Sequence, residues 1–259
     1  MASAFYEMRA EDRYVATRAT VGPWDPRLQH GSPPAALLAR VIDRVLPRPD
    51  ARIARIALDF FGPVPAAELT VTAESVRPGA RIDLSRARLA AAGRTVLEAT
   101  AWRLATGPDR APNVTDARPA PPLPGPQPQV LFPDVPSFPY GEAVEWRFVE
   151  GGFDRLGPAT VYARPRIPLI AGEPVSPLAR LLLMVDSANG ISAELPVSRF
   201  TFVPVELTVN VVRHPRTEWV GMSARTTIDE GGVGQTHAEL FDEAGYLGTA
   251  VQTLFVARK

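Results

Sequence analysis

The chain has 259 residues, with 28 Lys and Arg against 28 Asp and Glu, and it contains no cysteine. A formal net charge of zero offers no electrostatic footprint for nucleic acid or for an anionic membrane surface. The lack of cysteine excludes disulfides and thiolate chemistry. The first residues, MASAFYEMRAEDRY, lack the apolar segment of a signal peptide, and the most apolar run, LARLLLMV, is far shorter than a membrane span. We therefore expect a soluble, cytoplasmic protein.

The first marked element is a helix that begins at Ser32, in the stretch LQHGSPPAALLARVIDRVLP. Ser32 can serve as its N-cap and Pro33 as its first helical residue, where the missing N–H costs no hydrogen bond. His30 and Gly31 stand directly before it. The free N–H groups of a helix start attract a polarised oxygen, and Gly31 would let a ligand approach closely. The alternative is that Gly31 only makes the turn and His30 only packs.

Four β-type runs follow the helix in the first half: RIARIALDFF, ELTVTAESV, RIDLSRARLA and RTVLEATAWRLA. The joining segments RPGA and AAG are short, as antiparallel hairpins require. A proline-rich segment comes next, with eleven prolines between residues 108 and 139. Its composition predicts an extended, semi-rigid linker.

The second half repeats this order. A helix is expected from Ser176 and Pro177, in SPLARLLLMVDSANG, and it is followed by FTFVPVELTVNVV, EWVGMSARTTI, GQTHAELFD and YLGTAVQTLFVA. Each half thus predicts one helix and an antiparallel meander, so the economical architecture is a sheet curled around a central helix, made twice. We place an N-terminal repeat at residues 1–107, the linker at 108–141 and a C-terminal repeat at 142–259.

This arrangement resembles the double-hotdog acyl-CoA thioesterases, a thioesterase-like superfamily related to bacterial type II acyl-CoA thioesterases. The resemblance covers nearly the whole chain. HGSPPAALLARVIDRV is similar to the family's approach to the hotdog helix, and VELTVNVVRHP, MSARTTI and GTAVQTLFVAR are similar to its site-bearing strands. It implies an α+β fold of two fused hotdog repeats, an acyl-CoA substrate, no cofactor and, by analogy, a homodimer. It also implies catalytic roles for Glu206, for Thr227 or its neighbour Thr226, and for Gln252.

The same residues have other interpretations when the resemblance is set aside. Glu206 alternates with Val205 and Leu207, so it can simply lie on the solvated face of a strand. Gln252 shares a face with small and apolar residues, where an unpartnered amide would cost about 1–3 kcal/mol. Trp102 is expected at the matching place in the first half, which would leave the polar set in one half only.

Asp186 lies within the apolar second helix, where the first helix has Ile42. A carboxylate there is costly unless it is paired or used, although it could also act as a cap near the helix end at Gly190. Smaller single-hotdog thioesterases place an acid on this helix, and the segment MVDSANG is similar to that pattern. Asp186 is therefore a second candidate for the catalytic acid.

We expect the hydrolysis of a fatty or aromatic acyl-CoA thioester, as part of lipid metabolism. Glu206 or Asp186 would act as the general base on water, and Gln252 and Thr227 would orient that water. The amide of Gly31 would stabilise the oxyanion. The substrate-binding set expected at the helix start is His30, Gly31 and Ser32. No metal is expected, because the three histidines show no ligand spacing.

Two other functions stay open at this stage. Asp25 and His30, in DPRLQH, have the spacing of the Asp-x4-His pair of hotdog enoyl-CoA hydratases, although the flanking Asn-Pro is missing. A non-catalytic acyl-CoA-binding protein on the same fold is the third hypothesis. It is motivated by Glu206, which stands where the family more often has Asp.

Overall fold

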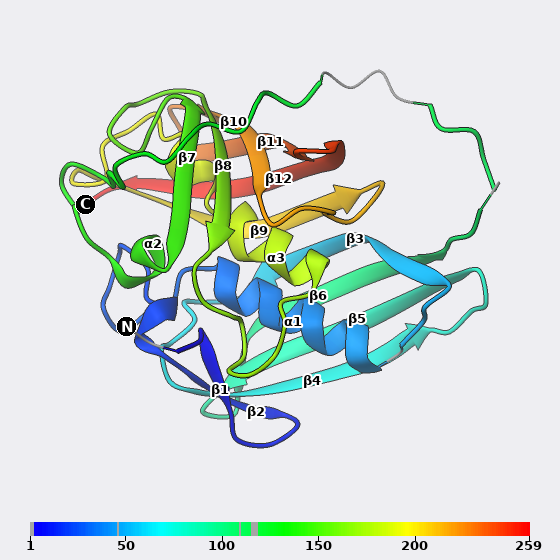
Figure 1. Cartoon of the computed structure of the whole chain (residues 1–259). Helices are drawn as coiled ribbons and strands as arrows, with labels where there is room; N and C mark the ends of the chain where they lie inside the picture. Colours follow the sequence, from blue (N-terminus) through cyan, green and yellow to red (C-terminus); the bar gives the residue numbers. More distant parts are fainter. Residues whose placement is uncertain (1–2, 46, 109, 115–118) are drawn as a thin grey trace.

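The computed structural model describes residues 3–45, 47–108, 110–114 and 119–259, and Figure 1 shows its arrangement. A single twelve-stranded antiparallel sheet curls around two helices, α1 (Ser32–Val45) and α3 (Pro177–Val185). The two helices pack against each other in the middle of the molecule, where Figure 1 draws them in blue and yellow-green. Each helix therefore buries its apolar side chains against one part of the sheet and against the other helix.

The sheet runs in the order β1-β2-β4-β5-β6-β3-β9-β12-β11-β10-β8-β7. The strands of the first half are β1 (Tyr6–Met8), β2 (Arg13–Ala16), β3 (Ala51–Phe60), β4 (Glu68–Arg77), β5 (Ile82–Ala91) and β6 (Arg94–Ala105). Those of the second half are β7 (Val144–Glu150), β8 (Ala159–Pro165), β9 (Phe200–Val211), β10 (Val220–Ile228), β11 (Val233–Asp242) and β12 (Gly245–Arg258). Three short helical segments are η1 (Arg18–Thr20), α2 (Pro139–Glu142) and α4 (Ala188–Ile191).

The hotdog architecture and the four strands after each central helix are confirmed, but the halves are not simple meanders. In the first half β3 lies beyond β6, not beside β4, and in the second half β9 likewise lies beyond β12. These two displaced strands pair with each other, from Arg55 opposite Asn210 to Asp59 opposite Glu206. The pairing removes one sheet edge from each half, so both halves share one continuous sheet.

The two central helices begin differently. At α3 the Ser176 hydroxyl accepts the N–H of Ala179 at 3.3 Å, so the predicted N-cap is confirmed. At α1 the carbonyl of Gly31 accepts the N–H of Ala35 at 3.1 Å, and Ser32 is already helical and buried. The capping position is therefore Gly31, one residue earlier than the sequence predicts.

The later part of the proline-rich linker, from Ala120 to Pro139, packs onto the second half, and residues 109 and 115–118 lie outside the described residues. Gln127 bonds through its side-chain amide to both backbone groups of Phe148, at 2.7 and 2.8 Å. Gln129 does the same with Trp146, at 2.8 and 3.0 Å. The two amides thus take the place of a neighbouring strand along β7, which is the last strand of the sheet. No described helix is long and apolar enough to cross a membrane.

Candidate active site

The candidate site lies where the start of α1 meets the end of α3. Asp186 is the C-cap residue of α3 and is 3% exposed. One carboxyl oxygen, Oδ2, lies 3.3 Å from Nδ1 of His30. The backbone amide of Gly31 also donates toward this carboxyl. Residues more than 150 positions apart in the chain are therefore in contact here.

Gln252 holds Asp186 from the sheet side. It lies on the inner face of β12 and is 0% exposed. Its Nε2 donates to Oδ1 of Asp186 at 3.0 Å and to the backbone carbonyl of the same residue at 3.1 Å. Its Oε1 accepts the N–H of Asn189 at 3.1 Å, from the first turn of α4. Because both ends of the amide are engaged, the orientation of Gln252 is fixed.

His30 is neutral at this position. Burial lowers the pKa of His30 to about 3. Nδ1 accepts the N–H of Ser32 at 3.1 Å, so we assign the ring proton to Nε2. The ring stacks on Tyr140, with 3.9 Å between centroids and 13° between planes. The contact between His30 and Asp186 is therefore not an ion pair at neutral pH.

The environment of Asp186 favours the protonated, neutral form of its carboxyl group. Burial raises the pKa of Asp186 to about 7, although the hydrogen bonds from Gln252 and from the Gly31 amide act in the opposite direction. A buried acid that titrates at the working pH and touches a helix start has the properties of a general acid or base.

Two family models match this chain. Residues 20–104 match the acyl-CoA thioesterase N-terminal domain, and residues 114–256 match the acyl-CoA thioesterase C-terminal domain. The chain belongs to the acyl-CoA thioesterase family. Thioester hydrolysis is therefore its activity, and acyl-CoA is its class of substrate.

Solved structures share the fold of this thioesterase. Acyl-CoA thioesterase II TesB2 from Mycobacterium marinum is 18% identical over 98% of this chain and 95% of its own, with a TM-score of 0.70. A hot dog fold protein from Alicyclobacillus acidocaldarius is 18% identical over 98% and 95%, with a TM-score of 0.74. The tesB protein of Mycobacterium avium is 14% identical over 97% and 96%, with a TM-score of 0.68. No curated protein matches the chain.

The structure does not bring Glu206 to the site of this thioesterase. Glu206 lies on the outer face of β9, where its carboxylate accepts from the hydroxyls of Thr208 and Thr253, both at 3.1 Å. Its neighbour Leu207 is the residue that lies opposite Gln252 in the sheet. Side chains alternate between the two faces of a strand, so Glu206 and Gln252 point to opposite faces.

Thr227 is exposed on β10 and does not face the site either. Thr226 is the buried neighbour on the inner face. Its hydroxyl lies 2.7 Å from that of Thr236 and 2.8 Å from that of Ser192. Thr236 in turn lies opposite Gln252, so this hydroxyl chain runs beside the site without bonding to the Gln252 amide.

The first half also carries a polar counterpart, so the expectation that Trp102 stands at this place and leaves the polar set in one half only is wrong. Trp102 is half-buried, whereas the next residue, Arg103, points inward and is 2% exposed. Arg103 donates to the backbone carbonyl of Ile42 at 3.2 Å. Ile42 occupies the helix position that matches Asp186, so Arg103 bonds its helix as Gln252 bonds Asp186. Both halves therefore keep a buried polar side chain at this place.

A small aromatic cavity lies against the site. Its volume is about 30 Å³, and His30, Ser187, Asn189 and Gly190 contribute to its wall. The aromatic members of the wall are Trp24, Phe132, Phe138, Tyr140, Phe153 and Phe202. No aromatic pattern in the sequence pointed to this cavity, because its wall comes from five separate segments of the chain.

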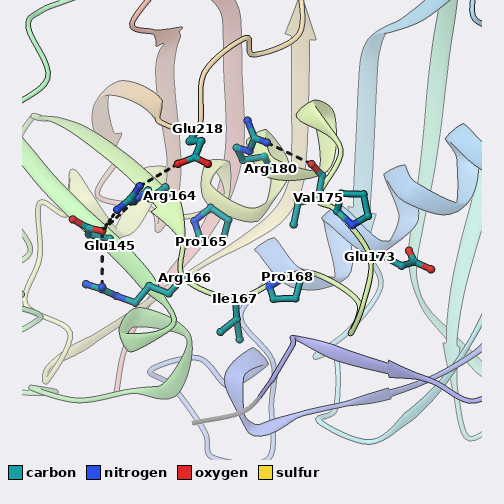
Figure 2. A pocket seen from close by; sticks show the side chains of 11 residues that line it. Glu145, Arg164, Pro165, Arg166, Ile167, Pro168, Glu173, Val175, Arg180 and Glu218 are labelled. Carbon is teal, nitrogen blue, oxygen red and sulfur yellow. Dashed lines mark hydrogen bonds and ion pairs between the residues drawn. The ribbon is translucent and has the colours of Figure 1, made fainter.

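A larger pocket of about 520 Å³ lies toward the start of α3, and Figure 2 shows it. Most of its charges are paired with each other. Arg164 bridges Glu145 at 3.0 Å and Glu218 at 3.1 Å, and Arg180 donates to the backbone carbonyl of Val175 at 3.5 Å (Figure 2). Arg180 also donates to the backbone carbonyl of Thr217. Asp186 lies at the opposite end of α3, so this pocket does not contain the candidate site. Among the described residues, no three His, Asp or Glu side chains are grouped so that they could hold a metal ion.

Proposed function

We propose that Asp186 is the general base of this thioesterase. The observation that carries the proposal is the placement of a buried carboxyl 3.3 Å from Nδ1 of His30, with a hydrogen bond of 3.0 Å from Gln252, and burial raises the pKa of this carboxyl to about 7. Such a group can take a proton from water near neutral pH and return it later in the same cycle. Gln252 acts as a positioning residue, since it fixes the carboxyl through two hydrogen bonds.

In this proposal His30 donates the hydrogen bond that stabilises the oxyanion. The Gly31 amide expected for that role donates toward Asp186. Nε2–H of the neutral His30 has no hydrogen-bond partner among the described residues, and His30 lines the aromatic cavity. A neutral imidazole is a suitable donor because its proton is held firmly and points at a fixed position.

The reaction then runs in two steps. The Asp186 carboxylate removes a proton from water, the water oxygen bonds to the thioester carbon, and the carbonyl electron pair moves to the oxygen held by His30. When the carbonyl re-forms, the carbon–sulfur bond breaks, and the proton on Asp186 passes to the leaving thiolate of CoA. The products are the free acid and CoA, and no co-reactant besides water is needed.

We further propose that the substrate carries an apolar acyl group, fatty or aromatic, and that the enzyme acts in cytoplasmic lipid metabolism. The aromatic wall beside His30 supports the apolar group. The homodimer expected by analogy also stays a prediction, to be checked by light scattering.

The hydratase alternative has little support. The carboxylate of Asp25 is held by its neighbour Arg27 at 2.7 and 3.0 Å, and this side-chain hydrogen bond lowers the pKa of Asp25 to about 2. Nδ1 of His30 is engaged by Ser32 and Asp186 instead. An acid with so low a pKa is a poor partner for protonating an enoyl carbon.

Thiol release from acyl-CoA, followed between pH 5 and 9, tests the proposal. The rate of the wild-type protein should rise with pH through about 7, as Asp186 ionises. Asp186→Asn should lower kcat by about a hundredfold or more and remove that pH dependence. Glu206→Gln is the matched control and should leave both unchanged. Crotonyl-CoA that gains water without releasing thiol would favour the hydratase, and full thiol release by Asp186→Asn would contradict the base assignment.

A further inference from the structure

The aromatic cavity lies directly beside the groups that would carry the reaction. His30, which lines it, is 3.3 Å from Asp186. Asn189, which also lines it, donates its N–H to Gln252 at 3.1 Å. A thioester carbonyl bound to Nε2 of His30 would therefore carry its acyl group into, or along, this cavity.

The walls of the cavity are aromatic rings that pack against one another. Phe132 meets Phe153 edge to face, with 5.0 Å between centroids, and Trp24 meets Phe202 in the same way at 5.2 Å. His30 itself stacks on Tyr140. Such contacts stabilise each ring beyond simple burial, so the shape of the cavity is set by interlocked side chains.

The size of the cavity restricts its occupant. This volume of about 30 Å³ is the space open to the centre of a water-sized sphere, and a cavity needs about 10–15 Å³ on the same measure to hold one water molecule. The cavity can therefore accept the end of a small apolar group but not a long chain. We infer that it is the acyl subsite and that this thioesterase acts on short-chain acyl-CoA, with acyl groups of about two to four carbons. This inference rests on the site proposed above and narrows its substrate to the short end of the fatty series.

Phe132, from the proline-rich linker, forms part of the cavity wall. Its ring is buried, and its Cζ lies 3.4 Å from the point that a Cβ on Gly190 would occupy. The linker is held in place by the bonds of Gln127 and Gln129 along β7, a few residues before Phe132. The linker thus contributes a specificity-determining side chain to the site, in addition to joining the two halves.

Chain-length profiles of thiol release test the inference, with acetyl-, butyryl-, hexanoyl-, decanoyl- and dodecanoyl-CoA as substrates. The wild-type protein should be most active on the acetyl and butyryl thioesters. Phe132→Ala should raise the ratio of kcat/KM for hexanoyl-CoA over butyryl-CoA by about tenfold or more, because one methylene in an apolar pocket is worth that much. Leu131→Ala is the matched control, since Leu131 is a buried linker neighbour outside the cavity wall, and its profile should stay that of the wild type.

A second variant works in the opposite direction and does not depend on whether Phe132→Ala folds. A methyl group on Gly190 would meet Phe132 at an ordinary contact distance, so Gly190→Ala should fold and narrow the cavity. It should lower the ratio of butyryl-CoA to acetyl-CoA hydrolysis by about tenfold. A wild-type preference for dodecanoyl-CoA, or identical profiles for Phe132→Ala and Leu131→Ala, would overturn the inference. Either result would leave the role of Asp186 intact, whereas loss of that role would show in the Asp186→Asn rates.

Discussion

Gln252 donates both to the carboxyl of Asp186, at 3.0 Å, and to the backbone carbonyl of the same residue, at 3.1 Å. The side chain of Gln252 therefore fixes both the C-terminal end of α3 and the carboxyl group of Asp186. Since the only other polar atom of the Gln252 amide is bonded to Asn189, the three residues form a closed arrangement inside the apolar core.

Gln252→Leu should weaken catalysis and move the pH–rate profile. The hydrogen bond from Gln252 lowers the pKa of Asp186, so its loss should shift the rising limb to higher pH. We expect kcat to fall by about ten- to a hundredfold, because the carboxyl loses its fixed position. Thr253→Val changes the neighbouring residue, whose hydroxyl bonds Glu206 on the outer face, and should leave the profile unchanged. A profile that does not move in Gln252→Leu would mean that the bond does not tune Asp186.

Asp186→Asn should stabilise the protein at alkaline pH. The folded-state pKa of Asp186, about 7, lies above the ordinary value of 3.8, so the folded state favours the protonated form. The protonated Asp186 carboxyl thus makes its full contribution to the stability of the fold below pH 3.8, and this contribution is lost as the pH rises through 7. The variant cannot ionise, so at pH 8 its free energy of unfolding should exceed that of the wild type by about 2–4 kcal/mol. At pH 4 the difference should nearly vanish. Urea unfolding at the two pH values checks this, and an equal difference at both would contradict it.

Gly31→Ala should disturb the site through a steric clash. A Cβ at this position would lie 2.6 Å from Oδ2 of Asp186 and 3.0 Å from the ring of Phe60. The carboxyl must shift, and we expect kcat to drop by about tenfold or more, with a loss of about 1–3 kcal/mol in stability. Gly62→Ala is the control, because no atom lies within 4 Å of its Cβ. Steady-state rates and thermal unfolding of both variants measure the difference, and similar rates for the two would refute it.

Arg103→Leu should affect stability and not the reaction. Arg103 is buried in the first half, where it donates to Ile42 and lies 3.7 Å from the buried Asp83. Removing one partner of a buried ion pair costs up to about 3–5 kcal/mol, and among the described residues the Asp83 carboxylate would keep only its contact with Arg48 at 3.8 Å. Arg103→Leu combined with Asp83→Asn should therefore recover part of the loss. Urea unfolding gives the energies, and a fall in kcat/KM of the folded variants would show that the first half takes part in the chemistry.

The sequence by itself determined the two central helices, the four strands that follow each of them and the two polar residues that matter most, but not β1, β2, β7 or β8. Ser-Pro steps mark the starts of both helices, and strand alternation marks the runs, because these signals act between near neighbours. Gln252 and Asp186 stood out because each is polar among apolar residues. Alternation also placed Glu206 on the face opposite Leu207, as the structure has it.

Only the tertiary structure decided which of these residues meet. The contact of His30 with Asp186 joins the two halves, and no local pattern encodes it. Arg103, not Trp102, faces inward because pairing between strands fixes the register, and β3 and β6 shift register between Ile53 and Arg55. The aromatic cavity likewise exists because packing brings Phe132 of the linker against Gly190 of α4. Register and packing depend on distant segments, so they are settled when the whole chain closes around its two helices.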